Sequence, residues 1–154
     1  MTSGLQSGTE LTGTSGHGPI RVLLVDDHRV VVESFSMLLQ LDGSCEVVGV
    51  ANSAENGVDL ARDLKPDIAI FDVDFPGRDS FDVVPDLIRW NKTQQKDMKI
   101  IFLTAHLSDV FVHQATSMGA RGYLLKGEPA TTVIDAIRRV HEGGSPFLNR
   151  SGTD

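Results

Sequence analysis

Acidic residues follow two apolar stretches of this sequence, and they are the residues most able to do chemistry. Asp26 and Asp27 follow the stretch IRVLLV, and Asp72 and Asp74 follow the stretch IAIF. A charge at the end of a buried strand is unfavourable unless something uses it. An aspartate in such a place can act as a nucleophile toward phosphorus. The Asp-Val-Asp spacing suits two chemistries, a phosphatase with a paired acid or a signalling domain that stores a phosphoryl group.

Two further polar residues stand at comparable places, since Thr104 follows KIIFL and Lys126 follows GYLL. A threonine hydroxyl can donate a hydrogen bond to a phosphoryl oxygen, and a lysine supplies a fixed positive charge. Uncompensated carboxylates raise one another's pKa. Mg²⁺ would relieve this repulsion, because it prefers carboxylate oxygens and keeps several of its waters. With metal and lysine shielding the charge, the set predicts a Mg²⁺-dependent site of aspartyl phosphorylation.

These side chains can meet only if the segments before them are neighbouring strands of one sheet. Short apolar runs alternate with segments of helical periodicity. Predicted strands cover residues 20–25, 46–51, 67–72, 99–105 and 122–126, and predicted helices cover residues 29–41, 54–65, 81–91, 109–118 and 129–142. This alternation and the apolar strands predict an α/β fold whose parallel sheet has helices on both faces. Its ligand site should lie beyond the carboxyl ends of the strands.

Four residues allow predictions about local structure. Pro85 removes a hydrogen bond about one turn into the third predicted helix, so we predict a late start or a kink there. Gly119 is the expected C-cap of the fourth helix. Cys45 is the only cysteine, which excludes an internal disulfide, and we expect it to be packed and inert. We interpret His28 as a loop or helix-start residue and not as a ligand.

The bulk properties narrow the class of protein. The chain has 154 residues, enough for one well-packed domain, and a formal net charge of −7. Acidic surfaces do not hold DNA or anionic membranes, because phosphate contacts need clustered Lys and Arg. No apolar run is long enough for a membrane span and no secretory signal is visible, so we expect a cytoplasmic protein. The Gly-, Ser- and Thr-rich residues 1–18 are predicted to be a disordered tail.

Four pieces of the chain resemble the receiver domains of two-component response regulators, the CheY-like family. They are LLVDDH, IFDVDFPG, FLTA and GYLLKG, in this order and at the family's intervals. The resemblance covers residues 19–145 and implies a flavodoxin-like, doubly wound five-stranded parallel sheet, (βα)5, with strand order 2-1-3-4-5. Residues 146–154 would be a tail or the start of a linker to a missing effector domain. VDDH, GARGYLLKG and HEGG resemble the NarL/LuxR-type subgroup, which usually carries a C-terminal helix-turn-helix DNA-binding domain.

The resemblance implies a role for each acidic residue. Asp72 would be the phosphoacceptor, and Lys126 would contact the phosphoryl group. Asp27 and Asp72 would give side-chain oxygens to Mg²⁺, Asp74 would give its backbone carbonyl, and Asp26 would reach the metal through water. The chain would thus be no multiple-turnover enzyme, since it would only gain and lose the phosphoryl group on Asp72.

The resemblance also implies the output and the partners. Thr104 would turn inward to bond the phosphoryl group and Tyr123 would follow as a rotameric switch, which would alter the surface of the fourth helix, fifth strand and fifth helix. The expected partners are a sensor histidine kinase and, in a longer chain, a DNA-binding effector domain that regulates transcription. The domain itself is expected to bind neither nucleic acid nor membrane. Homodimerisation through the fourth and fifth helices is a family-level expectation.

Some positions depart from the family's pattern. Ser80 stands where a glycine is frequent, which predicts less freedom in the loop after Asp72. Gly127 stands where many members have a cis proline after the lysine, so no cis bond is inferred. For the Asp74 side chain two interpretations stay open. It points to solvent, or together with His106 it flanks the phosphoryl group and tunes hydrolysis.

Two alternative functions belong to other classes. Haloacid-dehalogenase-type phosphatases also open with an apolar strand and Asp-x-Asp, but a Thr or Val normally comes two residues after the second aspartate, where this chain has Pro76. Their later acidic pair should also follow the lysine, whereas Asp26 and Asp27 precede every other motif. The other alternative is a receiver-like interaction module that is never phosphorylated, and the presence of all core residues argues against it.

Overall fold

The computed structural model describes residues 18–74, 80–106 and 108–143. The predicted tails, apart from Gly18, and residues 75–79 of the loop after Asp72 lie outside this part of the chain.

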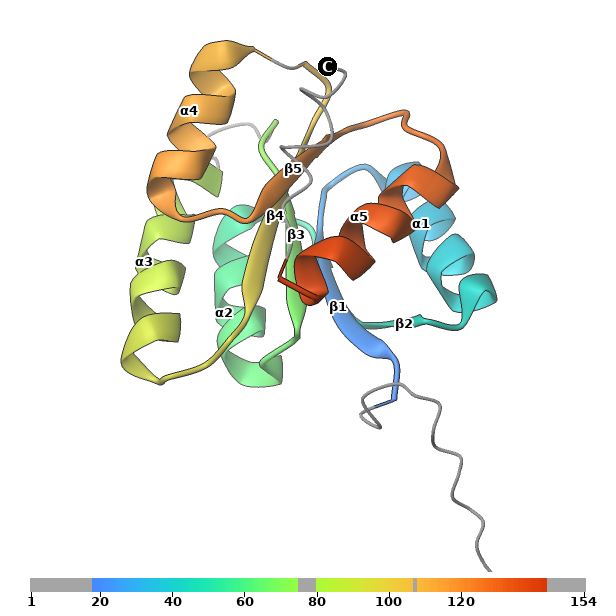
Figure 1. Cartoon of the computed structure of the whole chain (residues 1–154), viewed down its shortest axis with the longest axis horizontal. Helices are drawn as coiled ribbons and strands as arrows, with labels where there is room; N and C mark the ends of the chain where they lie inside the picture. The colour runs from blue at the N-terminus through green and yellow to red at the C-terminus, as the bar shows by residue number, and fades with distance from the viewer. Residues whose placement is uncertain (1–17, 75–79, 107, 144–154) are drawn as a thin grey trace, which may run out of the picture.

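Five strands and five helices alternate along the described residues (Figure 1). The strands are β1 (Ile20–Val25), β2 (Cys45–Ala51), β3 (Ile68–Asp72), β4 (Lys99–Thr104) and β5 (Gly122–Leu125). The helices are α1 (Arg29–Asp42), α2 (Ala54–Leu64), α3 (Ser80–Thr93), α4 (Asp109–Met118) and α5 (Ala130–His141). The predicted elements are confirmed, and no predicted end differs from the observed one by more than two residues.

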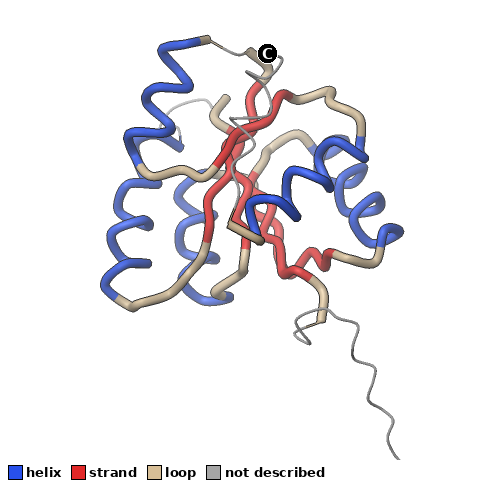
Figure 2. Tube along the Cα trace, in the orientation of Figure 1, coloured by secondary structure: helices blue, strands red, loops and turns tan. Residues whose placement is uncertain are grey.

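The strands form one parallel sheet in the order β2-β1-β3-β4-β5, which confirms the predicted topology. The sheet is the central layer between two layers of helices (Figure 2). Helices α2, α3 and α4 cover one face, and α1 and α5 cover the other (Figure 1). Strands β3 and β4 are buried along their whole length, as expected for a sheet covered on both sides. Parallel strands end at a common edge, so the residues that follow them are brought together there.

Two hydrophobic cores hold this sheet in place, one on each face. Successive residues of the central strands point into different cores, because side chains alternate across a strand. Phe71 and Phe102 pack toward α2, α3 and α4, whereas Ile70 and Ile101 pack toward α1 and α5. Cys45 is buried in the second of these cores, and burial raises the pKa of its thiol. The expected packing of this cysteine is therefore confirmed.

Helix α3 runs from Ser80 to Thr93 with Pro85 inside it, so the predicted late start is wrong. A proline in a helix interior removes one intrahelical hydrogen bond. Val83, Val84 and Leu87 are buried against the sheet and fix this helix despite that loss. The alternative of a kink stays a prediction. The expected C-cap of α4 is confirmed, because Gly119 has a left-handed backbone with a φ of 108°. In the described part of the chain, every helix is too short or too polar to cross a membrane.

The approach of α2 to the sheet gives a first prediction. A Cβ atom at Gly57 would lie 2.6 Å from both γ-methyl groups of Val25 and 3.0 Å from the Phe71 ring. We expect Gly57→Ala to lower the free energy of unfolding by up to about 2 kcal/mol, since overpacking typically costs about 1–3 kcal/mol and the gain in helix propensity is about 1 kcal/mol. Urea denaturation measures the difference. Asp59→Ala, on the exposed side of the same helix, is the control; a Gly57→Ala protein at least as stable as wild type would contradict the close packing.

Candidate functional site

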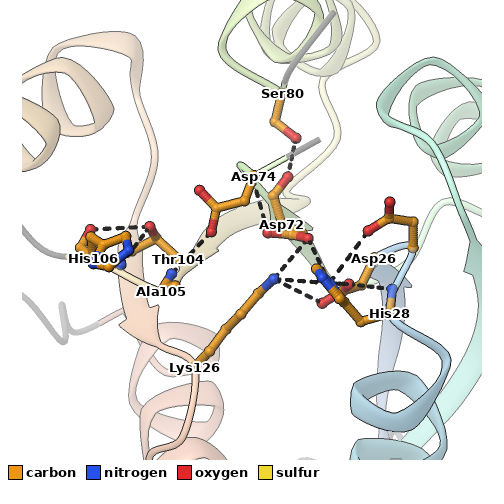
Figure 3. A network of polar contacts seen from close by, with 10 residues as sticks. Asp26, His28, Asp72, Asp74, Ser80, Thr104, Ala105, His106 and Lys126 are labelled. Atoms are coloured by element: carbon orange, nitrogen blue, oxygen red, sulfur yellow. Dashed lines mark hydrogen bonds and ion pairs between the residues drawn. The ribbon is translucent and has the colours of Figure 1, made fainter. Parts of the chain in front are cut away.

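Polar side chains from four strand ends gather at one edge of the sheet (Figure 3). Asp26 and Asp27 follow β1, Asp72 ends β3, Thr104 ends β4 and Lys126 follows β5. Because β1, β3, β4 and β5 are consecutive neighbours in the sheet, these residues converge although they are far apart in the sequence. The structure thus places the predicted residues at the predicted edge.

Asp72 lies at the centre of this group and is completely buried. Its Oδ2 forms an ion pair of 2.9 Å with the Nζ of Lys126. Its Oδ1 accepts a hydrogen bond of 3.0 Å from the backbone N–H of Asp74. Its backbone carbonyl accepts a bond of 2.5 Å from the hydroxyl of Ser80. The Asp72 carboxylate is therefore held at both oxygens and at its backbone.

The two aspartates that follow β1 differ in environment. Asp26 is buried. Its Oδ1 accepts a hydrogen bond of 2.8 Å from the backbone N–H of His28, and the Nδ1 of the same histidine also lies 2.8 Å from this oxygen. Its Oδ2 is also buried and accepts no hydrogen bond from the described residues, with the Nζ of Lys126 at 3.8 Å. Asp27 is more exposed, and its Oδ1 lies 3.3 Å from the Nδ1 of His28.

Burial and neighbouring charges change the pKa of two groups in this cluster. Burial raises the pKa of the Asp72 carboxyl, and the nearby Asp26 charge adds to the rise. The Asp74 N–H and the Lys126 ammonium oppose it without cancelling it. The hydrogen bond to Asp26 raises the pKa of the His28 imidazole, and the positive charge of Lys126 opposes that rise. The cluster thus contains more carboxylates than positively charged side chains, which favours the binding of a further cation.

Sequence reasoning missed what two residues contribute to this site. His28 is the N-cap residue of α1, as interpreted, but its imidazole lies inside the carboxylate cluster, 3.2 Å from the Nζ of Lys126. The sequence signal for this position was that His28 comes two residues after Asp26, because a chain that leaves a strand can turn a side chain back over the strand end. Ser80 is buried and bonds the Asp72 carbonyl. No motif points to that bond; the sequence showed only that a glycine is frequent there.

The residues expected to switch lie beside the loop between β4 and α4, with Thr104 at the end of β4 and Tyr123 in β5. The buried Thr104 hydroxyl donates to the carbonyl of His106 at 3.0 Å and accepts from its N–H at 3.2 Å. The Asp74 carboxylate accepts a bond of 3.0 Å from the N–H of Ala105, so its side chain reaches this loop although it is exposed. The Tyr123 ring is buried and meets Phe111 of α4 edge-on, with ring centroids 5.7 Å apart.

A divalent cation fits the cluster between β1 and β3. Asp26, Asp27, His28 and Asp72 each offer one ligand atom, and these atoms lie within 4.8 Å of one another. The unbonded, buried Oδ2 of Asp26 is an acceptor that such a cation could satisfy, directly or through water. Carboxylate oxygens are the ligands that Mg²⁺ prefers. Three of the four predicted metal ligands, Asp26, Asp27 and Asp72, thus lie where one ion could reach them, and the roles of all four stay predictions.

Comparisons with known proteins point to one family. The family described as the response regulator receiver domain matches residues 22–138. The chain is 36% identical over 124 residues to the transcriptional regulatory protein LiaR of Bacillus subtilis, a match that covers 80% of this chain and 57% of LiaR. It is 36% identical over 124 residues to the response regulator GacA of Pseudomonas aeruginosa, covering 80% of this chain and 56% of GacA. The chain thus spans little more than half the length of these relatives.

Solved structures agree with this result. A LuxR-family two-component response regulator from Aurantimonas sp. SI85-9A1 superposes with a TM-score of 0.75 at 28% identity, covering 82% of this chain and 88% of that chain. The sequence resemblance to receiver domains of the NarL/LuxR type and the flavodoxin-like fold are therefore confirmed.

The raised pKa of Asp72 gives a second prediction. The pKa of Asp72 in the folded protein lies above the ordinary value of 3.8, so ionisation of this carboxyl lowers the stability of the folded state. This loss of stability is absent below pH 3.8 and complete above the folded-state pKa. We expect Asp72→Asn to be more stable than wild type at neutral pH without Mg²⁺, and the two stabilities to converge as the pH falls through that window. Thermal unfolding against pH measures this.

Asp97→Asn is the matched control, because Lys99 lowers the pKa of Asp97 through a hydrogen bond and this substitution should destabilise the protein at neutral pH. A gap between Asp72→Asn and wild type that does not change with pH would contradict the raised pKa.

Proposed function

The chain belongs to the response regulator receiver domain family, and we propose that it is a phosphorylation-dependent switch of a two-component system, with Asp72 as the phosphoacceptor. The observation that supports this most is the position of Asp72, which is buried at the sheet edge and paired with Lys126 at 2.9 Å. A fully buried carboxylate beside a lysine and two further aspartates is costly as mere structure, and it suits a nucleophile that receives an anionic group.

The proposed reaction is a transfer of a phosphoryl group from a histidine of a sensor kinase. A carboxylate oxygen of Asp72 forms a bond to phosphorus, the P–N bond to the kinase imidazole breaks, and its electron pair stays on that imidazole, which takes up a proton. Lys126 would move with its charge from the carboxylate to a phosphoryl oxygen. Water later attacks the phosphorus, releases phosphate and restores the Asp72 carboxylate. Receiver domains are typically signalling modules, and this chain would perform no other chemistry.

Four residues would hold the metal ion of this reaction. Asp27 and Asp72 would give it side-chain oxygens, Asp74 its backbone carbonyl, and Asp26 a contact through water. When bound, Mg²⁺ supplies positive charge that offsets the repulsion between the carboxylate and the incoming phosphoryl group. The Asp74 N–H, already bonded to Oδ1, keeps the Asp72 carboxylate oriented during this step.

Rearrangement of the loop after β4 would turn the reaction into a signal. To donate to a phosphoryl oxygen, the Thr104 hydroxyl must give up its bond to the His106 carbonyl. Asp74 holds the same loop through the N–H of Ala105. The loop leads into α4, and Tyr123 packs on Phe111 of that helix. The surface of α4, β5 and α5 would thus change with phosphorylation, which is a population shift between two states.

The output would be transcriptional regulation. Matched relatives are named transcriptional regulators, and this chain spans little more than half of their length. The net charge of −7 disfavours contact between this chain and DNA, so we propose that a DNA-binding effector domain on the same polypeptide makes that contact.

Phosphorylation can be tested directly. Incubation with Mg²⁺ and acetyl phosphate should add one phosphoryl group per chain by intact-mass spectrometry, and Asp72→Asn should remove at least about nine-tenths of it. Asp97→Asn, at the opposite end of the sheet, is the control that should be modified like wild type. Absence of Asp72-dependent incorporation and of beryllofluoride binding would favour a module that is never phosphorylated. Sustained release of phosphate from phosphate esters would favour a phosphatase.

Asp74 gives a further prediction about the lifetime of the phosphoryl group. Its exposed carboxylate can accept a proton from the attacking water, so we expect Asp74→Ala to lengthen the half-life of the aspartyl phosphate at least about threefold. Asp74→Asn separates the charge from the shape, and His106→Ala tests the second residue expected to flank the group. Decay of labelled protein measures the rate. Lifetimes equal to wild type in all three variants would leave Asp74 and His106 without a role in hydrolysis.

A further inference from the structure

We propose that a cavity at the amino ends of β3 and β4 binds a small organic anion with a planar ring, of the size of a nucleoside monophosphate. Asp72 lies at the opposite end of these parallel strands, so this site is separate from the proposed phosphorylation site. The cavity has a volume of about 280 Å³, just below the range of about 300–1,000 Å³ typical of sites for drug-sized molecules. It can therefore hold one small molecule.

Positive charge is concentrated at this cavity, although the chain as a whole has a net charge of −7. Three of the chain's five lysines line it, namely Lys65, Lys96 and Lys99. The ammonium groups of Lys65 and Lys96 form no hydrogen bond or ion pair with any residue that the structure describes. An anion in the cavity would thus meet two cations that no described side chain neutralises.

Lys99 adds a buried ammonium group to the wall of the cavity. Its side chain is only 10% exposed, and among the described residues its Nζ has one partner, the Oδ2 of Asp97 at 2.8 Å. Asp97 is 89% exposed, so it offsets the cost of burying the lysine charge only in part. An ammonium group has three donors, and two of them are available to a ligand anion.

The two aspartates at the cavity do not cancel its positive charge. The Oδ2 of Asp67 accepts a hydrogen bond of 2.8 Å from a backbone N–H of β1, and Asp97 is paired with Lys99. The hydrogen bond from Lys99 lowers the pKa of the Asp97 carboxyl, and the charges of Lys99, Arg121 and His141 lower it further. The electrostatic field at this end of the sheet therefore favours the ionised form of an acid, and the same field favours a bound anion.

An aromatic wall indicates that the ligand is an organic molecule and not a bare ion. Trp90, the chain's only tryptophan, lines the cavity and is half-buried. Aromatic rings stack on other planar groups, from which an inorganic anion gains nothing. His141 also lines the cavity, and its Nδ1 is buried without a hydrogen bond to any described residue. Buried nitrogens are normally bonded, and a polar atom of the ligand would supply the partner.

The backbone of Lys65 supports a role for this residue other than stability. Lys65 follows α2 with a φ of 49°, in the left-handed region where glycine is the favoured residue. In the described part of the chain, Lys65 and Gln95 are the two residues other than glycine with a positive φ, and Gln95 precedes Lys96. Strain of this kind is frequent where a site needs a particular side chain. A lysine at the cavity gives this position a reason to depart from glycine.

The test uses the whole chain without Mg²⁺ and follows the fluorescence of Trp90, which reports on this cavity because the chain has no other tryptophan. The probe is AMP, with ribose 5-phosphate as the probe that lacks the ring and adenosine as the probe that lacks the charge. We expect AMP to change the fluorescence with a dissociation constant below about 1 mM. AMP should also bind at least about fivefold more tightly than either partial probe, since stacking and a charge-assisted hydrogen bond each contribute at least this factor.

Two substitutions separate binding from stability. Lys99→Met keeps a long side chain and removes its charge, and we expect it to raise the AMP constant at least about tenfold. Lys65→Gly should raise the AMP constant at least about twofold and yet increase the urea midpoint, because glycine relieves the strained backbone. Lys92→Met, at an exposed position of α3 that does not line the cavity, and Lys126→Met, beside Asp72, are the controls that should bind AMP like wild type.

The outcomes distinguish this site from unspecific attraction between a surface lysine and phosphate. AMP binding that is weakened in Lys99→Met and Lys65→Gly and unchanged in both controls would support the proposal. An AMP constant above about 1 mM in wild type, an equal loss of binding in Lys92→Met, or ribose 5-phosphate that binds as tightly as AMP would overturn it. None of these measurements depends on phosphorylation of Asp72, so the proposed function stands or fails separately.

Discussion

The burial of the Asp72 carboxylate is the constraint on which the rest of the site depends. A fully buried carboxylate loses its hydration, and the raised pKa of Asp72 shows that its partners offset this loss only in part. Lys126 supplies the largest single opposing charge, and the N–H of Asp74 supplies a dipole. The remaining imbalance would favour the binding of a further cation, because its positive charge would reduce the repulsion between the carboxylates.

The architecture makes this arrangement rigid on one side and adaptable on the other. Asp26, Asp72 and Lys126 follow or end strands that are fixed by two hydrophobic cores, and Ser80 ties the start of α3 to the Asp72 carbonyl. In contrast, Thr104 and Asp74 hold the loop after β4 through three hydrogen bonds, two to His106 and one to Ala105. One new charge can break a few hydrogen bonds that contribute about 1 kcal/mol each, but it cannot rearrange a packed hydrophobic core. In the proposed switch, the part of the site that responds would therefore be the loop and not the sheet.

The fold could be predicted almost completely because its signals are local and repeated. Apolar runs, helix periodicity and strand-end charges all pointed to the same sheet, and the order of the strands followed from the family resemblance. Failures occurred where tertiary contacts outweigh local preference. Pro85 does not delay α3, because three buried residues of that helix pack on the sheet. The side-chain position of His28 depends on how the chain turns after β1, and the bond from Ser80 to the Asp72 carbonyl depends on where α3 docks. Neither follows from residue type.

The hydrogen bonds around Asp74 connect the two halves of the site. Its N–H is bonded to one oxygen of Asp72, and its carboxylate is bonded to the N–H of Ala105, next to Thr104. A phosphoryl group on Asp72 would add negative charge within reach of the Asp74 carboxylate, and the two would repel each other. That repulsion acts on the bond to Ala105 while the phosphoryl oxygens compete for the same donors. Loss of the bond to Ala105 and release of the Thr104 hydroxyl from His106 would thus favour each other, and the loop would respond as one unit to the charge state of Asp72.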